Sequence, residues 1–316
     1  MINKYDHIFI AGHNGLVGSS VLRKFRQKGF TNLITVNKDK LNLRDTTKVK
    51  KFFKNKKVDY MVIAAARAGG IMANLKNQKN FFIENVEIQN SLLQLALEKK
   101  IKRTIFLGTS CIYPKFSKTP IKEEYLLTGK LEKTNQCYAI AKISGIKLCE
   151  TLYEDHNLNT ICLMPTNVYG YNDNFDKDNG HVIPAMITKI LQAKQKKIEK
   201  LKLFGTGKPL REFIHSDDLA DAILFCLNLN KIKLKKMFKN KLPILNIGTK
   251  DELTIKSLSK LISKLIGYSG IIQFDRNFPD GTFRKNLDTT KINNLGWYPK
   301  IKLKEGLKKV IETRIS

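Results

Sequence analysis

A tyrosine and a lysine lie four residues apart in the segment YAIAK, at Tyr138 and Lys142. On a helix this spacing puts both side chains on one face, within reach of each other. A tyrosine, with a pKa of about 10, is a poor acid or base at neutral pH, but a neighbouring ammonium stabilises the phenolate and lowers that pKa. The pair therefore indicates proton transfer. The alternative for so common a spacing is an exposed helix face.

Two hydroxyls and a thiol follow an apolar segment in LGTSCIYP, where Thr109, Ser110 and Cys111 stand together. The chain has five cysteines with no CxxC pair, and an odd number leaves at least one without a disulfide partner. Free thiols in a reducing compartment are therefore expected. A cysteine whose thiolate forms readily suits proton chemistry. A small buried side chain is the alternative for Cys111.

Three glycines in GHNGLVG, namely Gly12, Gly15 and Gly18, lie between a predicted strand and a predicted helix. Glycines at such a junction permit a tight turn and let the backbone approach a pyrophosphate, with the helix N-terminus facing the anion. The spacing is GxxGxxG rather than the GxGxxG of most dinucleotide-binding folds. The prediction of a dinucleotide site therefore depends on the strand–turn–helix context of these glycines. Lys38 follows the second strand and favours the 2′-phosphate of NADP(H), while Asp39 leaves NAD possible.

Apolar and amphipathic segments alternate along the first half of the chain and must position these side chains. Strands are predicted at residues 7–12, 32–37, 58–66, 103–110 and 159–170, and helices at 16–29, 46–57, 83–100 and 136–156. Strands that are almost wholly apolar and alternate with helices indicate a parallel sheet covered on both faces. The expected fold class is α/β, with a Rossmann-type doubly wound parallel sheet and a smaller mixed α/β C-terminal substrate domain.

The pattern changes after about residue 170, where a polar loop precedes a predicted helix at 182–197 and a strand at 200–205. We predict an NADP-binding domain over residues 1–170, to whose sheet a segment near 211–229 returns. Residues 171–316 would mainly form the substrate domain. A chain of 316 residues is long enough for two such domains.

The order of these features, over essentially the whole chain, resembles the extended short-chain dehydrogenase/reductase family. That resemblance implies a catalytic triad of Thr109, Tyr138 and Lys142. Thr109 would hydrogen-bond the substrate carbonyl oxygen, Tyr138 would exchange the proton, and Lys142 would tune Tyr138 and hold the nicotinamide ribose. Most members have serine where this chain has Thr109, and Ser110 is adjacent.

Six blocks narrow the resemblance: GTSCIYPK, YAIAKISGIKLCE, MPTNVYGYNDNF, GHVIPAMI, GTGKPLREFIH and PDGTFRKNLD. In this order they resemble the GDP-4-keto-6-deoxy-D-mannose 3,5-epimerase–4-reductases, a subfamily whose product is GDP-L-fucose. The resemblance implies that Cys111 is the base and His181 the acid at the carbons flanking the ketone, before NADPH reduces C4. A GDP-colitose synthase-like enzyme is the nearest alternative. A 4-epimerase that recycles bound NAD would need no such pair.

The resemblance also places the ligands. The cofactor-binding candidates are Gly12, Gly15, Leu16, Val17, Gly18, Lys38, Ala65, Ala66, Tyr138, Lys142 and His181. The candidates for the GDP-sugar are Ser110, Asn167, Lys189, Phe204, Gly205, Arg211, Asp280 and Lys285. Among these, Arg211 suits the diphosphate because its planar fork matches phosphate oxygens. Lys189 and Lys285 are weaker candidates for the diphosphate, and Asp280 suits the ribose hydroxyls.

The formal net charge of +29 could mark a nucleic-acid binder, but the lysines are spread along the whole chain. The sequence also lacks an RNA-binding motif, a zinc-finger spacing and an arginine-rich stripe, so no nucleic acid and no metal are expected. A non-catalytic dinucleotide-binding or nucleic-acid-binding protein remains the distant alternative.

The N-terminal segment carries charges where a signal peptide is apolar, and no apolar run reaches the roughly 18 residues that span a bilayer. A cytoplasmic protein without membrane contact is therefore expected. By analogy with related enzymes we predict a homodimer through a four-helix bundle formed by residues 84–99 and 136–156.

Overall fold

Alternate side chains of the central strands pack on opposite faces of one sheet, and this sets the layers of the molecule. The computed structural model describes residues 2–315. Its main sheet has the order β2-β1-β3-β4-β5-β9, with every neighbouring pair parallel. The strands are β1 (Ile8–Ala11), β2 (Leu33–Ile34), β3 (Tyr60–Ile63), β4 (Arg103–Leu107), β5 (Thr160–Pro165) and β9 (Ile244–Ile247). In β1, Ile8 and Ile10 enter one core while Phe9 and Ala11 enter the other.

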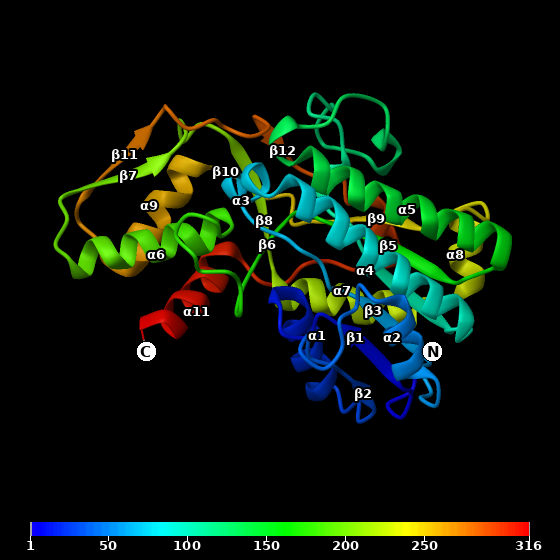
Figure 1. Cartoon of the computed structure of the whole chain (residues 1–316). Coiled ribbons are helices and arrows are strands. Elements are labelled where there is room, and N and C mark those ends of the chain that lie inside the picture. Colours follow the sequence, from blue (N-terminus) through cyan, green and yellow to red (C-terminus); the bar gives the residue numbers. More distant parts are fainter. Residues whose placement is uncertain (1, 316) are drawn as a thin grey trace.

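Helices cover both faces of this sheet (Figure 1). One face packs against α2 (Thr46–Phe53), α4 (Gln78–Glu98) and α5 (Gln136–His156). The other packs against α1 (Leu16–Gln27), α7 (Ser216–Asn228), α8 (Lys231–Met237) and α10 (Thr290–Leu295). The predicted doubly wound α/β fold is therefore confirmed.

A second, smaller core lies beyond one end of the sheet, at the left of Figure 1. Its helices are α6 (Val182–Gln195), α9 (Ile255–Ile266) and α11 (Leu303–Ile315). Two small sheets accompany them, formed by β7 (Lys200–Phe204) with β11 (Ile271–Asp275), and by β6 (Asn167–Tyr169), β8 (Leu210–His215), β10 (Glu252–Thr254) and β12 (Arg284–Lys285). Short elements complete the chain: α3 (Ile71–Lys76), η1 (Ser110–Ile112), η2 (Glu123–Tyr125) and η3 (Lys133–Asn135).

Two segments differ from the prediction. The strand expected over 159–170 breaks at Thr166, because its N–H binds Ile247 of the main sheet while its hydroxyl binds the carbonyl of Glu212 in β8. The segment near 211–229 returns to the main sheet through α7, which covers one face of it, but its strand β8 pairs with β6, β10 and β12. The strand that joins the main sheet is β9.

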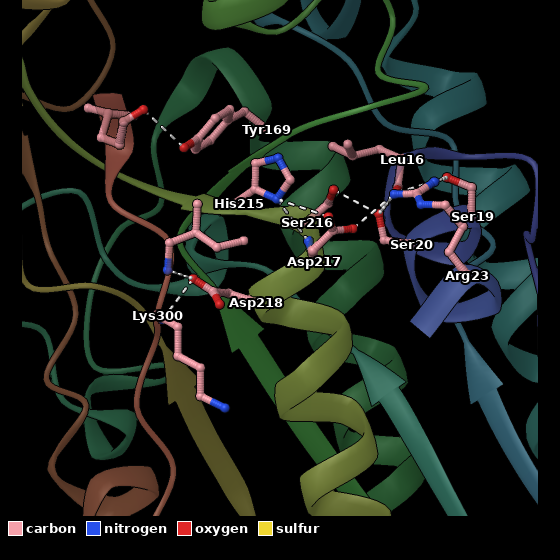
Figure 2. Close-up of polar contacts among 12 residues, drawn as sticks. Leu16, Ser19, Ser20, Arg23, Tyr169, His215, Ser216, Asp217, Asp218 and Lys300 are labelled. Atoms are coloured by element: carbon pink, nitrogen blue, oxygen red, sulfur yellow. Dashed lines mark hydrogen bonds and ion pairs between the residues drawn. The ribbon is translucent and has the colours of Figure 1, made fainter. Parts of the chain in front are cut away.

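A polar cluster joins the glycine-loop helix α1 to α7 and to the C-terminal segment (Figure 2). The Arg23 guanidinium donates to Asp217 at 2.9 Å and to Ser20 at 2.7 Å, and the Ser20 hydroxyl donates to Ser216. The Asp218 carboxylate accepts the backbone N–H groups of residues 300 and 301, just before α11. The last helix is therefore tied to the same junction as the first.

The division of the chain near residue 170 stays a prediction. Residues 244–247 complete the main sheet, so the two cores are interleaved in sequence. Among the helices of residues 2–315, none has the length and apolar character needed to cross a membrane.

Candidate active site

A cavity of about 590 Å³ lies where the carboxyl ends of the main-sheet strands face the second core. Ligands of open α/β sheets bind at this edge. Most of the residues predicted from sequence line it: Gly15, Leu16, Val17, Ala66, Thr109, Ser110, Cys111, Tyr138, Lys142, Asn167, His181, Lys189, Phe204, Arg211, Asp280 and Lys285. The other candidates, Gly12, Gly18, Lys38, Ala65 and Gly205, lie outside the lining.

The glycine loop is built for close backbone contact. Gly12 has φ +84°, and a Cβ there would stand 2.7 Å from the Cα of Ala65 on the loop after β3. A Cβ on Gly18 would collide with the Gly12 carbonyl, so α1 can pack this closely only with glycine. Gly12 and Gly18 are not among the residues that line the cavity, and their close packing fixes the position of the loop that does. Gly15 precedes α1, whose first N–H groups point outward from the helix end, where a diphosphate would bind.

Lys38 is exposed on the loop after β2, outside the cavity lining. Nearby, the Asn14 amide donates to the Asn37 side chain at 3.1 Å, which links the glycine loop to the end of this strand region. A loop in this place is where the adenosine ribose of a dinucleotide lies in this fold class. The position of Lys38 is therefore compatible with the predicted 2′-phosphate contact.

Tyr138 on α5 and Thr109, which follows β4, line the cavity together. Burial raises the pKa of Tyr138 above its ordinary value, with a further increase from Cys111 and an opposing effect of the Thr109 hydroxyl. Because its pKa is raised, the phenol stays protonated at neutral pH, which suits a group that donates a proton to a reduced carbonyl oxygen. The sequence had predicted a lowered pKa for Tyr138.

Lys142 explains why the prediction for Tyr138 was wrong in direction. Its ammonium donates to the carbonyl of Leu107 at 2.8 Å and lies 4.9 Å from the centre of the Phe106 ring. Burial lowers the pKa of Lys142 to about 8. An ammonium held by a backbone carbonyl does not compensate for the burial of the neighbouring phenol.

Cys111 faces the cavity from η1, directly beyond the triad hydroxyl. Its backbone N–H donates to the Thr109 hydroxyl at 3.3 Å, which fixes the short turn. The thiol accepts from the Asn135 amide at 3.2 Å and from the Lys285 ammonium at 3.4 Å. Sequence analysis missed Asn135, because an Asn just before a helix is usually explained as a helix cap.

His181 enters the same cavity from the start of α6. Its Nδ1 lies 3.2 Å from the Asp173 carboxylate, whose side chain is only 3% exposed. Burial acts to lower the pKa of His181, but the hydrogen bond and charge of Asp173 outweigh it and the net shift is upward. Sequence analysis missed Asp173. It lies eight residues before His181 in a loop with several other acidic and amide residues, and no local spacing distinguishes it.

We expect Asp173→Asn to narrow the pH range over which His181 acts as an acid. Without the carboxylate charge the pKa of His181 falls, so the imidazolium is lost at lower pH and the alkaline limb of proton exchange moves down by about one pH unit. Solvent deuterium uptake into the sugar, measured across pH, tests this. Asp178→Asn is the matched control, since Asp178 lies on the same loop but pairs with Lys189. Equal shifts in both variants would contradict the role of Asp173.

The far end of the cavity presents cations and aromatic rings. The Lys189 ammonium lies 3.8 Å from the centre of the Phe204 ring, and Phe278 stacks on Phe204 with centroids 3.8 Å apart. Sequence analysis missed Phe278. Arg211 lines the cavity while donating to the carbonyl of Leu210 at 2.7 Å.

Two predicted substrate contacts also have structural partners. The Asp280 carboxylate accepts from the backbone N–H and the hydroxyl of Thr206, at 3.0 and 2.6 Å. Gly205 has φ +85° and packs against this carboxylate, so it supports the turn without lining the cavity. The Asn167 amide donates to the carbonyl of Glu212 at 2.9 Å.

Comparison with known proteins identifies the family. The model of the NAD dependent epimerase/dehydratase family matches residues 8–248. The chain belongs to this family. This confirms the resemblance inferred from the triad and the glycine loop, whose residues lie inside the matched range.

Several members of the family are similar over nearly their whole length. GDP-L-fucose synthase 1 of Arabidopsis thaliana is 44% identical over 97% of this chain and 92% of its own. GDP-L-fucose synthase of Escherichia coli K12 is 41% identical over 96% and 94%. GDP-L-colitose synthase of Yersinia pseudotuberculosis is 35% identical over 96% of both chains.

A solved structure of the family has the same fold. A GDP-D-glycero-L-gluco-heptose synthase from Campylobacter jejuni, determined in the presence of NADPH, superposes with a TM-score of 0.92. It is 33% identical and covers 100% of both chains. The epimerase/dehydratase fold therefore extends over the second core as well as the main sheet.

Proposed function

We propose that the protein converts GDP-4-keto-6-deoxy-D-mannose to GDP-L-fucose, by epimerisation at C3 and C5 followed by reduction at C4 with NADPH. The observation that carries this proposal is the presence of Cys111 and His181 in the cavity that also holds Thr109, Tyr138 and Lys142. A simple 4-reductase needs only the last three. The similarity to GDP-L-fucose synthases over nearly the whole chain supports the same substrate.

Epimerisation would use the thiol and the imidazole as a pair. A C–H bond next to a ketone is acidic because its electrons can move onto the carbonyl oxygen. Cys111, as thiolate, removes this proton, and His181 returns one to the opposite face of the carbon. Thr109 and Tyr138 hydrogen-bond the enolate oxygen in the interval, so that its negative charge is stabilised.

Reduction would follow in the same position. The glycine loop and the uncovered first turn of α1 fit a dinucleotide, and NADPH supplies a hydride to C4 when bound. Tyr138 then donates its proton to the oxygen that becomes the C4 hydroxyl. The raised pKa of Tyr138 keeps that proton available at neutral pH. Lys142 lines the same cavity as Tyr138 and would hold the nicotinamide ribose.

The proposal is tested by turnover of the purified protein with GDP-4-keto-6-deoxy-D-mannose, following oxidation of NADPH and NADH in parallel and identifying the sugar. GDP-L-fucose formed with NADPH is the expected result. The similarity to a GDP-L-colitose synthase favours one other candidate, a keto-sugar without the 3-hydroxyl. Faster turnover of that 3-deoxy keto-sugar than of GDP-4-keto-6-deoxy-D-mannose would identify the 3-deoxy sugar as the substrate instead.

We expect Lys38→Ala to weaken the preference for NADPH over NADH by about tenfold. The substitution removes a cation beside the predicted 2′-phosphate and leaves the rest of the adenosine contacts in place. The ratio of kcat/KM for the two cofactors measures the change. Lys40→Ala, which removes an exposed lysine from the same loop, serves as the control. An unaltered ratio in Lys38→Ala would exclude this lysine from cofactor selection.

A homodimer belongs to the same proposal. Helices α4 and α5 pack side by side, and each carries a partly exposed apolar side chain, Phe82 and Ile140, at 38% and 40%. Two copies of this helix pair could form the predicted four-helix bundle. Sedimentation at micromolar concentration is expected to give twice the 36.2 kDa mass of the chain. A monomer would contradict the proposed homodimer.

All five cysteines lie within the described residues and are free, which is compatible with the proposed cytoplasmic location.

A further inference from the structure

An asparagine at the start of α5 does not act as a helix cap. Asn135 occupies the position before Gln136, yet its side chain caps none of the described N–H groups of this helix. Asparagine is favoured at such positions because it usually makes that bond. Here the amide Nδ2–H instead donates to the Cys111 sulfur at 3.2 Å. The side chain has therefore exchanged a local stabilising bond for a contact inside the cavity.

A lysine reaches the same sulfur from the far end of the sequence. Lys285 lies on β12, which pairs in parallel with β8 so that residue 285 stands beside Arg211. Its ammonium lies 3.4 Å from the Cys111 sulfur. The buried Glu212 carboxylate accepts the backbone N–H of Leu287, which holds the strand at this register. The lysine is thus placed on a fixed strand rather than on a free loop.

Cationic and neutral hydrogen-bond donors surround the Cys111 sulfur. The Arg211 guanidinium also interacts electrostatically with Cys111, and the Tyr138 phenol nearby is neutral. The Glu132 carboxylate acts on the Lys285 and Arg211 cations, but it is itself paired with Lys115 at 3.0 Å. A sulfur that accepts from an ammonium and an amide is stabilised as thiolate, because both donors bind negative charge more strongly than a neutral thiol.

We propose that Lys285 and Asn135 hold Cys111 as a thiolate and are positioning residues for the epimerase base. This rests on the function proposed above and assigns Lys285 a different role from the diphosphate contact predicted from sequence. The thiol loses its proton to solvent in the open cavity. The thiolate then takes a proton from the sugar carbon, so that the enolate forms as the thiol is restored.

Alkylation of Cys111 by iodoacetamide without substrate tests this proposal directly. Only the thiolate reacts, and mass spectrometry of the Cys111 peptide separates it from the partly exposed Cys137. In Lys285→Met we expect the rate at neutral pH to fall about tenfold and the rate–pH profile to move up by about one pH unit. Lys285→Arg should restore most of the rate. Asn135→Leu should lower it by a smaller factor, about threefold.

Lys189→Met is the matched control, because it removes another cation of the cavity whose partners are Asp178 and Phe204 rather than the thiol. The pH profile of Cys111 alkylation in Lys189→Met should equal that of the protein without substitutions. A Lys285→Met profile that also equals it would overturn the proposal. NADPH binding, followed by cofactor fluorescence, checks that each variant is folded.

Turnover separates the two possible roles of Lys285. If Lys285 stabilises the thiolate, Lys285→Met lowers kcat for deuterium uptake at neutral pH. This kcat should recover at higher pH, and the KM for the GDP-sugar should stay nearly unchanged. A raised KM with an unchanged alkylation profile would assign Lys285 to the diphosphate and overturn the proposal. The alkylation result does not depend on the substrate. A shifted profile in a protein that fails to turn over GDP-4-keto-6-deoxy-D-mannose would therefore reject the proposed function and leave the thiolate site intact.

Discussion

Cys111→Ala is expected to lower solvent deuterium uptake at C3 and C5 of the keto-sugar by a factor of about 10² to 10⁴, the usual contribution of a positioned base. The substitution removes the sulfur that faces the cavity between Asn135 and Lys285. The adjacent Tyr138 phenol does not replace it, because burial keeps the phenol protonated, and the Asn135 amide is not a base. The uptake is measured in D₂O by NMR or mass spectrometry of the sugar.

The effect should be confined to epimerisation. Affinity for NADPH is expected to stay the same, since Cys111 lies on η1 and the glycine loop precedes α1. Cys137→Ala provides the control, as this other partly exposed cysteine contacts Gln78 at 3.6 Å and lies outside the cavity lining. Deuterium uptake that persists at the original rate in Cys111→Ala would remove the thiol from the mechanism.

Tyr138→Phe is expected to lower the rate of NADPH oxidation by about 10³-fold, within the range for loss of a general acid. The phenol is the proton donor to the C4 oxygen, and burial keeps it protonated. Phenylalanine retains the ring that packs edge-on against Phe81, with centroids 6.1 Å apart, so the fold should be maintained. Single-turnover absorbance with saturating substrate measures the hydride step without product release.

Deuterium uptake in Tyr138→Phe should fall less than reduction does. The Thr109 hydroxyl remains to hydrogen-bond the enolate oxygen, whereas the proton needed at C4 has lost its source. Tyr153→Phe removes a phenol from the same helix outside the cavity and should leave both rates unchanged. If Tyr138→Phe reduced the ketone at the original rate, a different hydroxyl would have to be the acid, and the adjacent Ser110 would be the first to examine.

The sheet could be predicted from sequence because its strands are short, almost wholly apolar and separated by amphipathic helices. Strands β1, β3 and β4 lie where the pattern put them. Helix α4 begins at Gln78, five residues before the predicted start, because Asn85 binds the backbone of Arg67 and Phe81 and stabilises the extra turn. The hydrogen bond between Arg67 and Asn85 spans 18 residues, so no periodic pattern in the sequence indicates it.

The residues of the candidate active site could likewise be predicted only in part from the sequence. Tyr138 and Lys142 share one helix face, and Thr109 and Cys111 are two residues apart, so spacing relates the members of each pair, while the family resemblance implied that the two pairs belong to one site. Asp173, Asn135 and Phe278 became candidates only when loops from separate segments met at the cavity. The role of Lys285 could not be inferred from its neighbours either, since its place beside the thiol depends on the pairing of β12 with β8.

The late arrival of β9 in the main sheet has a consequence for synthesis of the protein. Until residues 244–247 have left the ribosome, β5 is an edge strand, and its residues, from Thr160 to Pro165, are all buried in the finished fold. An apolar edge strand is a site for pairing with other chains. Nascent chains that hold the complete triad therefore still expose an aggregation-prone strand. Fragments ending near residue 229 should depend on chaperones for solubility, whereas in the full-length chain β9 pairs with β5 and covers this edge.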